Sequence, residues 1–233
     1  CEPINHLMAR FAIPSIIAML VSALYNMVDQ FFIGHSVGMQ GNAATNVAFP
    51  LTITCTAVSL LFGIGGAANF NLSMGRKKAE EAKHFIGNAI FLMLSFGITL
   101  CLLVFLFLDP LLKLFGATAD ILTYSRTYTS ITAFGFPFVI LATGGSNLVR
   151  ADGSPNFSMA CTLIGCLINL VLDPLFIFVF HMGVAGEAIA TVISQIVSCL
   201  FVLGCLFSKR MPVRLGWGDF HLRVMKRIVT FGF

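Results

Sequence analysis

Six apolar runs, each long enough to cross a lipid bilayer, constrain the fold of this chain more than any other feature. They cover roughly residues 11–33, 45–72, 85–108, 122–149, 159–180 and 186–207. A bilayer core about 30 Å thick needs about 20 apolar residues in a helix. Only 10% of the residues are charged, against about 25% in soluble domains. We therefore predict an all-α membrane protein in which residues 1–208 form a six-transmembrane-helix lobe.

The basic residues are distributed unevenly around these runs. When the N-terminus is placed in the cytoplasm, only Lys113 and Arg126 of the 14 Lys and Arg residues fall on the far side. Cytoplasmic loops of membrane proteins carry such an excess of basic residues. We predict a multi-pass protein of the plasma membrane, the inner membrane of a bacterium, with a cytoplasmic N-terminus and the lipid bilayer around it. The formal net charge of +4 is then a topology signal, and no nucleic-acid partner is expected.

The sequence favours neither an enzyme nor a bound cofactor. It contains no HExxH or GxSxG motif, patterns that typify zinc proteases and serine hydrolases. The seven cysteines form no CxxC pair and most lie in apolar runs, so we predict neither a disulfide framework nor a zinc site.

The segment Asn169–Pro174 places a carboxylate inside the fifth apolar run. An ionisable group at that depth costs several kcal/mol unless it is paired, hydrated or neutralised, and it indicates a functional site. Asn169 lies four residues before Asp173, on the same helical face. Pro174 lacks a backbone donor and crowds the carbonyl of Leu170, which predicts a kink. The carboxylate, the amide and a freed carbonyl are expected to gather there, as in the interrupted helices of transporters.

Polar residues also follow one face of the first and sixth runs. The first carries Ser22, Asn26, Asp29 and Gln30, and the sixth carries Glu187, Thr191, Ser194, Gln195 and Ser198. Polar faces turn away from lipid. At about 1.5 Å per residue, Asp29, Asp173 and Thr191 should lie at similar depth.

We therefore predict one cavity where these faces meet. No Lys or Arg lies at that depth on these helices, so the missing positive charge would be a proton or a metal ion. The predicted cation and substrate site is Asp29, Asn169, Asp173 and Thr191, with Asn26 and Gln195 as further candidates. If the ion is Na⁺, the same four residues would hold it.

Four segments resemble motifs of the multidrug and toxic compound extrusion (MATE) transporters. They are Tyr25–Gly34, Leu148–Pro155, Asn169-x-x-x-Asp173-Pro174, and Gly183–Gly186 with Ala188–Thr191. The resemblance is greatest to the bacterial, NorM- and DinF-like branch. It implies the N-terminal half of a twelve-helix transporter that exports cationic or amphipathic drug-like compounds in exchange for H⁺ or Na⁺. It also implies the same four residues as the cation site.

The resemblance further implies a division of the chain and a partner. Residues 209–227 would be a basic cytoplasmic linker, and residues 228–233 would begin a second six-helix lobe that completes the protein. The alternative within the same superfamily is a flippase for lipid-linked oligosaccharides. Its anionic pyrophosphate substrate calls for a cationic cavity, whereas the cavity predicted here is acidic.

Overall fold

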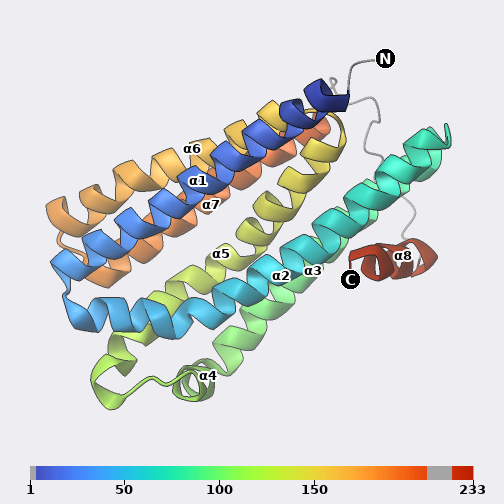
Figure 1. Ribbon diagram of the computed structural model, residues 1–233. Coiled ribbons are helices and arrows are strands. Elements are labelled where there is room, and N and C mark those ends of the chain that lie inside the picture. Colours follow the sequence, from blue (N-terminus) through green and yellow to red (C-terminus); the bar gives the residue numbers. More distant parts are fainter. Residues whose placement is uncertain (1–3, 209–221, 233) are drawn as a thin grey trace.

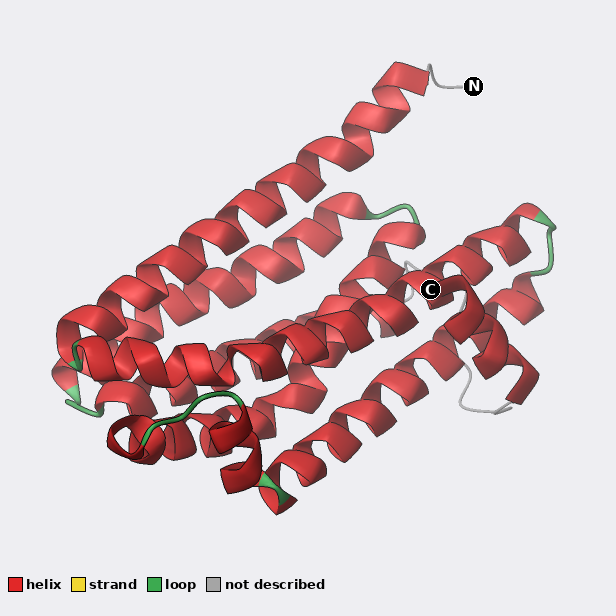
Figure 2. Ribbon diagram, turned by 60° about the horizontal axis from the view of Figure 1, so that its bottom comes forward, coloured by secondary structure: helices red, strands yellow, loops and turns green. Residues whose placement is uncertain are grey.

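The computed structural model describes residues 4–208 and 222–232, and helices account for all the regular structure in these two ranges (Figures 1 and 2). The elements are α1 (Ile4–Ser36), α2 (Met39–Gly75), α3 (Ala79–Leu106), α4 (Leu108–Leu114), α5 (Ala119–Ala151), α6 (Pro155–Pro174), the π-helix η1 (Leu175–Val179), α7 (Gly183–Phe207) and α8 (Leu222–Gly232). Six segments in the described part are long and apolar enough to cross a membrane. This confirms the predicted lobe; the short helices α4 and α8 lie outside those six.

Helix α5 is the centre of the lobe. It packs against α2 and α3 on one side and against α6 and α7 on the other, while α1 lies mainly along α6. The start of α1, the α2–α3 turn and the α5–α6 turn all lie at one end of the bundle, where α8 also lies (Figure 1). The predicted orientation would make this end cytoplasmic.

Small residues allow α2 and α5 to approach closely. A Cβ atom added to Gly63 would lie 2.7 Å from the Cα and carbonyl oxygen of Gly144, which is too close for any side chain. Next to this crossing, Phe62, Met93 and Ile140 are almost completely buried. Glycine is favoured at such contacts because, in lipid, close backbone packing rather than the hydrophobic effect holds helices together.

The fifth membrane segment changes its helix type at Pro174, where the sequence predicts a kink. α6 ends at this residue, and the next turn, Leu175–Val179, is a π-helix. Proline cannot complete the regular hydrogen-bond ladder, and a wider π turn is one way in which a helix accommodates such an interruption. Asp173 therefore sits at the irregular point of the segment.

The predicted boundary between linker and second lobe, at residues 227 and 228, falls inside α8. Residues 209–221 of the predicted linker lie outside the described residues. α8 packs against α2, near Leu61 and Gly65, and against the start of α3. There Ile228 is buried, and Arg227 forms an ion pair of 3.2 Å with Glu81.

Candidate cation site

Asn169 links α6 to α7 at the end of the lobe opposite α8. Its side-chain amide donates to Oδ1 of Asp173 at 3.1 Å and to Oγ1 of Thr191 at 3.3 Å. The first partner lies one turn further along α6, and the second projects from α7. Asn169 and Asp173 are each only 1% exposed. The amide therefore fixes the Asp173 carboxylate and joins two helices through a polar contact.

α1 brings a second carboxylate to the same point. Asp29 is 7% exposed, and its carboxyl group lies within hydrogen-bonding reach of Asp173. Tyr25, one turn earlier on α1, lies close to Thr191 of α7. The structure thus brings together Asp29, Asn169, Asp173 and Thr191, the four residues selected from depth and spacing.

Glu187 is a third carboxylate in this cluster, and the sequence-based site did not include it. It is 1% exposed and lies within hydrogen-bonding reach of Asp29. Its Oε1 accepts a hydrogen bond of 3.3 Å from the Tyr128 hydroxyl of α5. A signal was present in the sequence, because Glu187 precedes Thr191 by one helical turn in the same polar stripe. The depth comparison covered only Asp29, Asp173 and Thr191.

The two further candidates lie outside this acidic cluster, which we define as Asp29, Asp173 and Glu187. Asn26 is exposed, and its amide donates to the Ser22 carbonyl of its own helix at 2.8 Å. Gln195 is half-buried and packs on α5, where a Cβ added to Gly135 would lie 2.2 Å from Gln195 Oε1. Each lies one helical turn, about 5 Å along the helix axis, from a residue of the predicted site, and at that position it has other neighbours.

Among the side chains that the structure describes, no basic group forms an ion pair with the acidic cluster. The ion pairs among the described residues all involve other carboxylates, Glu80, Glu81 and Asp109. Buried oxygens without a hydrogen-bond partner include Asp29 Oδ1, Glu187 Oε2 and Asn169 Oδ1. A carboxylate only accepts hydrogen bonds, and buried charges of one sign repel strongly. Three carboxyl groups this close together therefore require protons or a cation among them.

The arrangement of the three carboxyl groups does not form a metal site by itself. Across residues 4–208 and 222–232, no group of three or more His, Cys, Asp and Glu side chains has a geometry that could hold a metal ion. The neutral oxygens of Asn169 and Thr191 are the additional ligands that a hard cation such as Na⁺ would need. Protons need no such ligands, since a carboxylic acid donates directly to a neighbouring carboxylate.

Fold and site together define a six-helix membrane lobe with an acidic cluster buried between α1, α6 and α7. The MatE family model matches residues 14–175, and the chain belongs to this family. It is 30% identical over 222 residues to the multidrug export protein MepA of Staphylococcus haemolyticus, covering 95% of this chain and 49% of that protein.

Solved structures give the same relationship. An outward-facing multidrug resistance MATE family transporter of the MOP superfamily superimposes with a TM-score of 0.90 at 27% identity, over 97% of this chain and 50% of that one. A MATE protein in complex with MaD3S gives a TM-score of 0.90 at 27% identity, over 97% and 51%. The chain therefore spans about half the length of the relatives that it matches, as expected for one lobe.

Proposed function

We propose that this lobe forms the cation-coupling half of a multidrug antiporter, which exports cationic or amphipathic compounds in exchange for H⁺ or Na⁺. The observation that carries the proposal is the acidic cluster, which is buried in a membrane lobe and has no basic partner in the described part of the chain. The relatives are multidrug export proteins by name, which supports the class of substrate. A second six-helix lobe would complete the transport path.

Competition for one site would provide the coupling. When the cluster holds its coupling cation, its negative charge is compensated and it attracts a cationic drug weakly. Release of that cation restores the charge, which favours the drug. Each ligand then lowers the affinity for the other, and this reciprocity is required by linkage.

The close approach of these carboxyl groups favours H⁺ as the coupling ion. Asp29 reaches both Asp173 and Glu187, a geometry that protons shared between the groups stabilise. Na⁺ would instead take oxygens from Asp29, Asp173, Asn169 and Thr191, with six or so ligands typical of hard cations.

Gradient-driven efflux by the full-length protein in proteoliposomes tests the proposal. Ethidium efflux is measured under an imposed pH gradient and, separately, under a Na⁺ gradient. We expect one gradient to drive efflux, and Asp29→Asn and Asp173→Asn each to reduce it at least tenfold. Asp120→Asn is the matched control, since Asp120 is exposed in the first turn of α5. Failure of both gradients, or full activity in both cluster variants, would refute the antiporter assignment.

A further inference from the structure

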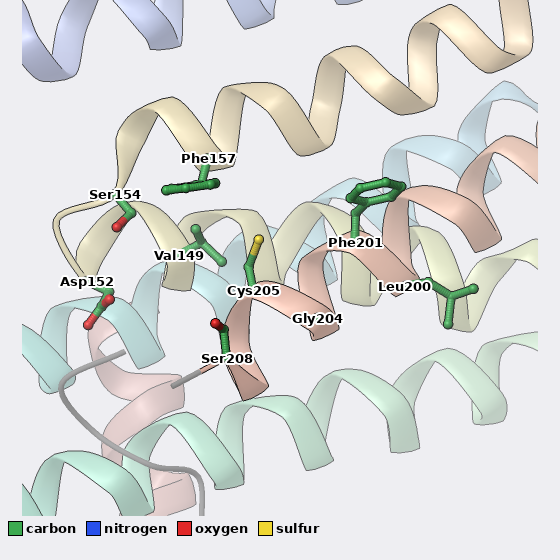
Figure 3. A pocket seen from close by; sticks show the side chains of 9 residues that line it. All are labelled: Val149, Asp152, Ser154, Phe157, Leu200, Phe201, Gly204, Cys205 and Ser208. Atoms are coloured by element: carbon green, nitrogen blue, oxygen red, sulfur yellow. The ribbon is translucent and has the colours of Figure 1, made fainter. Parts of the chain in front are cut away.

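A pocket of about 440 Å³ lies beside the α5–α6 turn (Figure 3). This turn is at the end of the lobe opposite the acidic cluster, since Asp173 lies at the other end of α6. It is bounded by the C-terminal ends of α5 and α7, the turn between α5 and α6, and the first turn of α6. Its volume falls within the range of small-molecule sites, about 300–1,000 Å³. On the predicted orientation this end of the lobe faces the cytoplasm.

The pocket combines apolar walls with one charged group. Phe157 of α6 and Phe201 and Leu200 of α7 supply the walls. Asp152, in the turn, is the charged residue among those that line the pocket. Its Oδ1 atom is buried and has no hydrogen-bond partner. A carboxylate in a pocket that two phenyl rings also line is suited to an organic cation, because the carboxylate balances its charge and the ring faces attract it.

The pocket is separate from the acidic cluster. Phe157 and Asp173 stand on the same two-part membrane segment, roughly 25 Å apart at the rise of an α-helix. Between them α6 and α7 are in close contact: Ser198 Oγ donates to the Cys161 carbonyl at 3.0 Å, and a Cβ added to Gly165 would meet Ser198 Cβ at 3.1 Å. A ligand in the pocket therefore cannot reach the acidic cluster along the α6–α7 contact.

We propose that this pocket is a second binding site, which takes amphipathic organic cations with an aromatic or branched apolar body. Asp152 pairs with the cationic centre, and Phe157 and Phe201 hold the apolar body. Its role as a loading site on the cytoplasmic side rests on the proposed efflux function, but the binding itself does not.

Tetraphenylphosphonium binding to the full-length protein isolates this site when the acidic cluster is neutralised by Asp29→Asn, Asp173→Asn and Glu187→Gln. We expect saturable binding to persist, and Asp152→Asn in that background to weaken it at least tenfold. Asp152→Glu keeps the charge and should retain binding within about threefold. Asp120→Asn is the control at the far end of α5. Binding that is equally tight in Asp152→Asn and Asp152→Glu would overturn the proposal.

Tetraphenylborate separates charge from shape, since it has nearly the same shape as tetraphenylphosphonium and the opposite charge. It should bind at least tenfold more weakly, and equal affinity for the two ions would contradict the pairing with Asp152. Phe201→Ala should weaken phosphonium binding several-fold and leave the preference for the cation unchanged. Unchanged phosphonium affinity in Phe201→Ala would show that the Phe201 ring does not take part in binding.

The pH dependence of binding gives an independent readout. Burial raises the pKa of the Asp152 carboxyl to about 6, so the ionised form that binds a cation prevails above this pH and is lost below it. Among the described residues, the neighbouring groups are Arg150 of α5, which stays charged throughout, and the Cys205 thiol of α7. Phosphonium binding in the cluster-neutralised background should fall as the pH drops from 7.5 to 5, and pH-independent binding would count against Asp152.

The two proposals can fail separately. Asp152-dependent phosphonium binding without gradient-driven efflux would support the second binding site and refute the antiporter function. Gradient-driven efflux in the wild-type protein, with no phosphonium binding once the acidic cluster is neutralised, would support the antiporter function and refute the second binding site.

Discussion

Replacing Glu187 by Gln tests whether the third carboxylate takes part in cation coupling. The substitution keeps the shape of a side chain that is 1% exposed and removes only its charge. The amide oxygen can still accept the hydrogen bond from the Tyr128 hydroxyl, which spans 3.3 Å in the structure. We therefore expect the unfolding temperature to change little and the coupling to change strongly.

The expected size of the effect follows from the contact between Glu187 and Asp29. A cation about 4 Å from a carboxylate gains about 4 kcal/mol at an effective dielectric constant of about 20. The dipole of the Gln amide recovers part of this. A net loss of at least about 1.4 kcal/mol corresponds to a tenfold weaker apparent affinity for the coupling cation.

The assay is ethidium efflux from proteoliposomes at a series of coupling-ion concentrations. The Glu187→Gln variant should need at least ten times more H⁺ or Na⁺ for half-maximal efflux. Glu80→Gln makes the same substitution at an exposed position paired with Lys83 at the opposite end of the lobe, and it should behave as the wild type. Glu187→Gln within twofold of the wild type would show that Glu187 is a structural member of the cluster only.

Two further substitutions separate packing from coupling. Gly63→Ala would place a methyl group 2.7 Å from the α5 backbone, so we expect overpacking to lower the unfolding free energy by about 1–3 kcal/mol. Gly204→Ala is the control, because a Cβ atom there has nothing within 4 Å, and it should be neutral or slightly stabilising. Equal unfolding temperatures for the two variants would refute the packing argument. Asn169→Ala removes two hydrogen bonds worth about 0.6 kcal/mol each in a membrane, so the unfolding temperature should fall only slightly. Efflux should fall at least tenfold, because the Asp173 carboxylate is no longer held in position. Asn147→Ala, which removes a bond to its own helix, is the matched control, and equal efflux by the two variants would exclude a role for Asn169 in holding Asp173.

The membrane segments could be predicted because their signal is local. Each apolar run must form its own helix in lipid, so composition alone located the six segments that the structure contains. The signal for an interruption of the helix at Pro174 was equally local. The conversion to a π turn after Pro174 was not predicted, because it depends on how the following residues pack against α1 and α7.

The meeting of Asp29 with Asp173 followed from two arguments that do not need tertiary contacts. Polar faces turn inward, and helix rise sets depth. Neither argument fixes the rotation of a helix to better than about one residue, and this limit explains the remaining differences. Asn26 and Gln195 lie on the predicted polar stripes, but their side chains have partners outside the acidic cluster. Glu187 lies nearer the membrane surface, and its side chain belongs to the acidic cluster.

All three carboxylates of the acidic cluster come from this one lobe, so their charge acts on the packing of helices within it. Asp29 reaches the cluster from α1, Asp173 from α6 and Glu187 from α7, and α1 touches the rest of the lobe chiefly through α6. A change in the charge of the cluster therefore acts first on the contact that holds α1 in place. Uncompensated carboxylates would push α1 away from α6 and α7, and a bound cation would draw it back. We expect accessibility labelling of α1 in the full-length protein to follow the coupling-ion concentration, and to lose this dependence in Asp29→Asn. Labelling that responds to the ion equally in both proteins would separate the motion of α1 from the cluster.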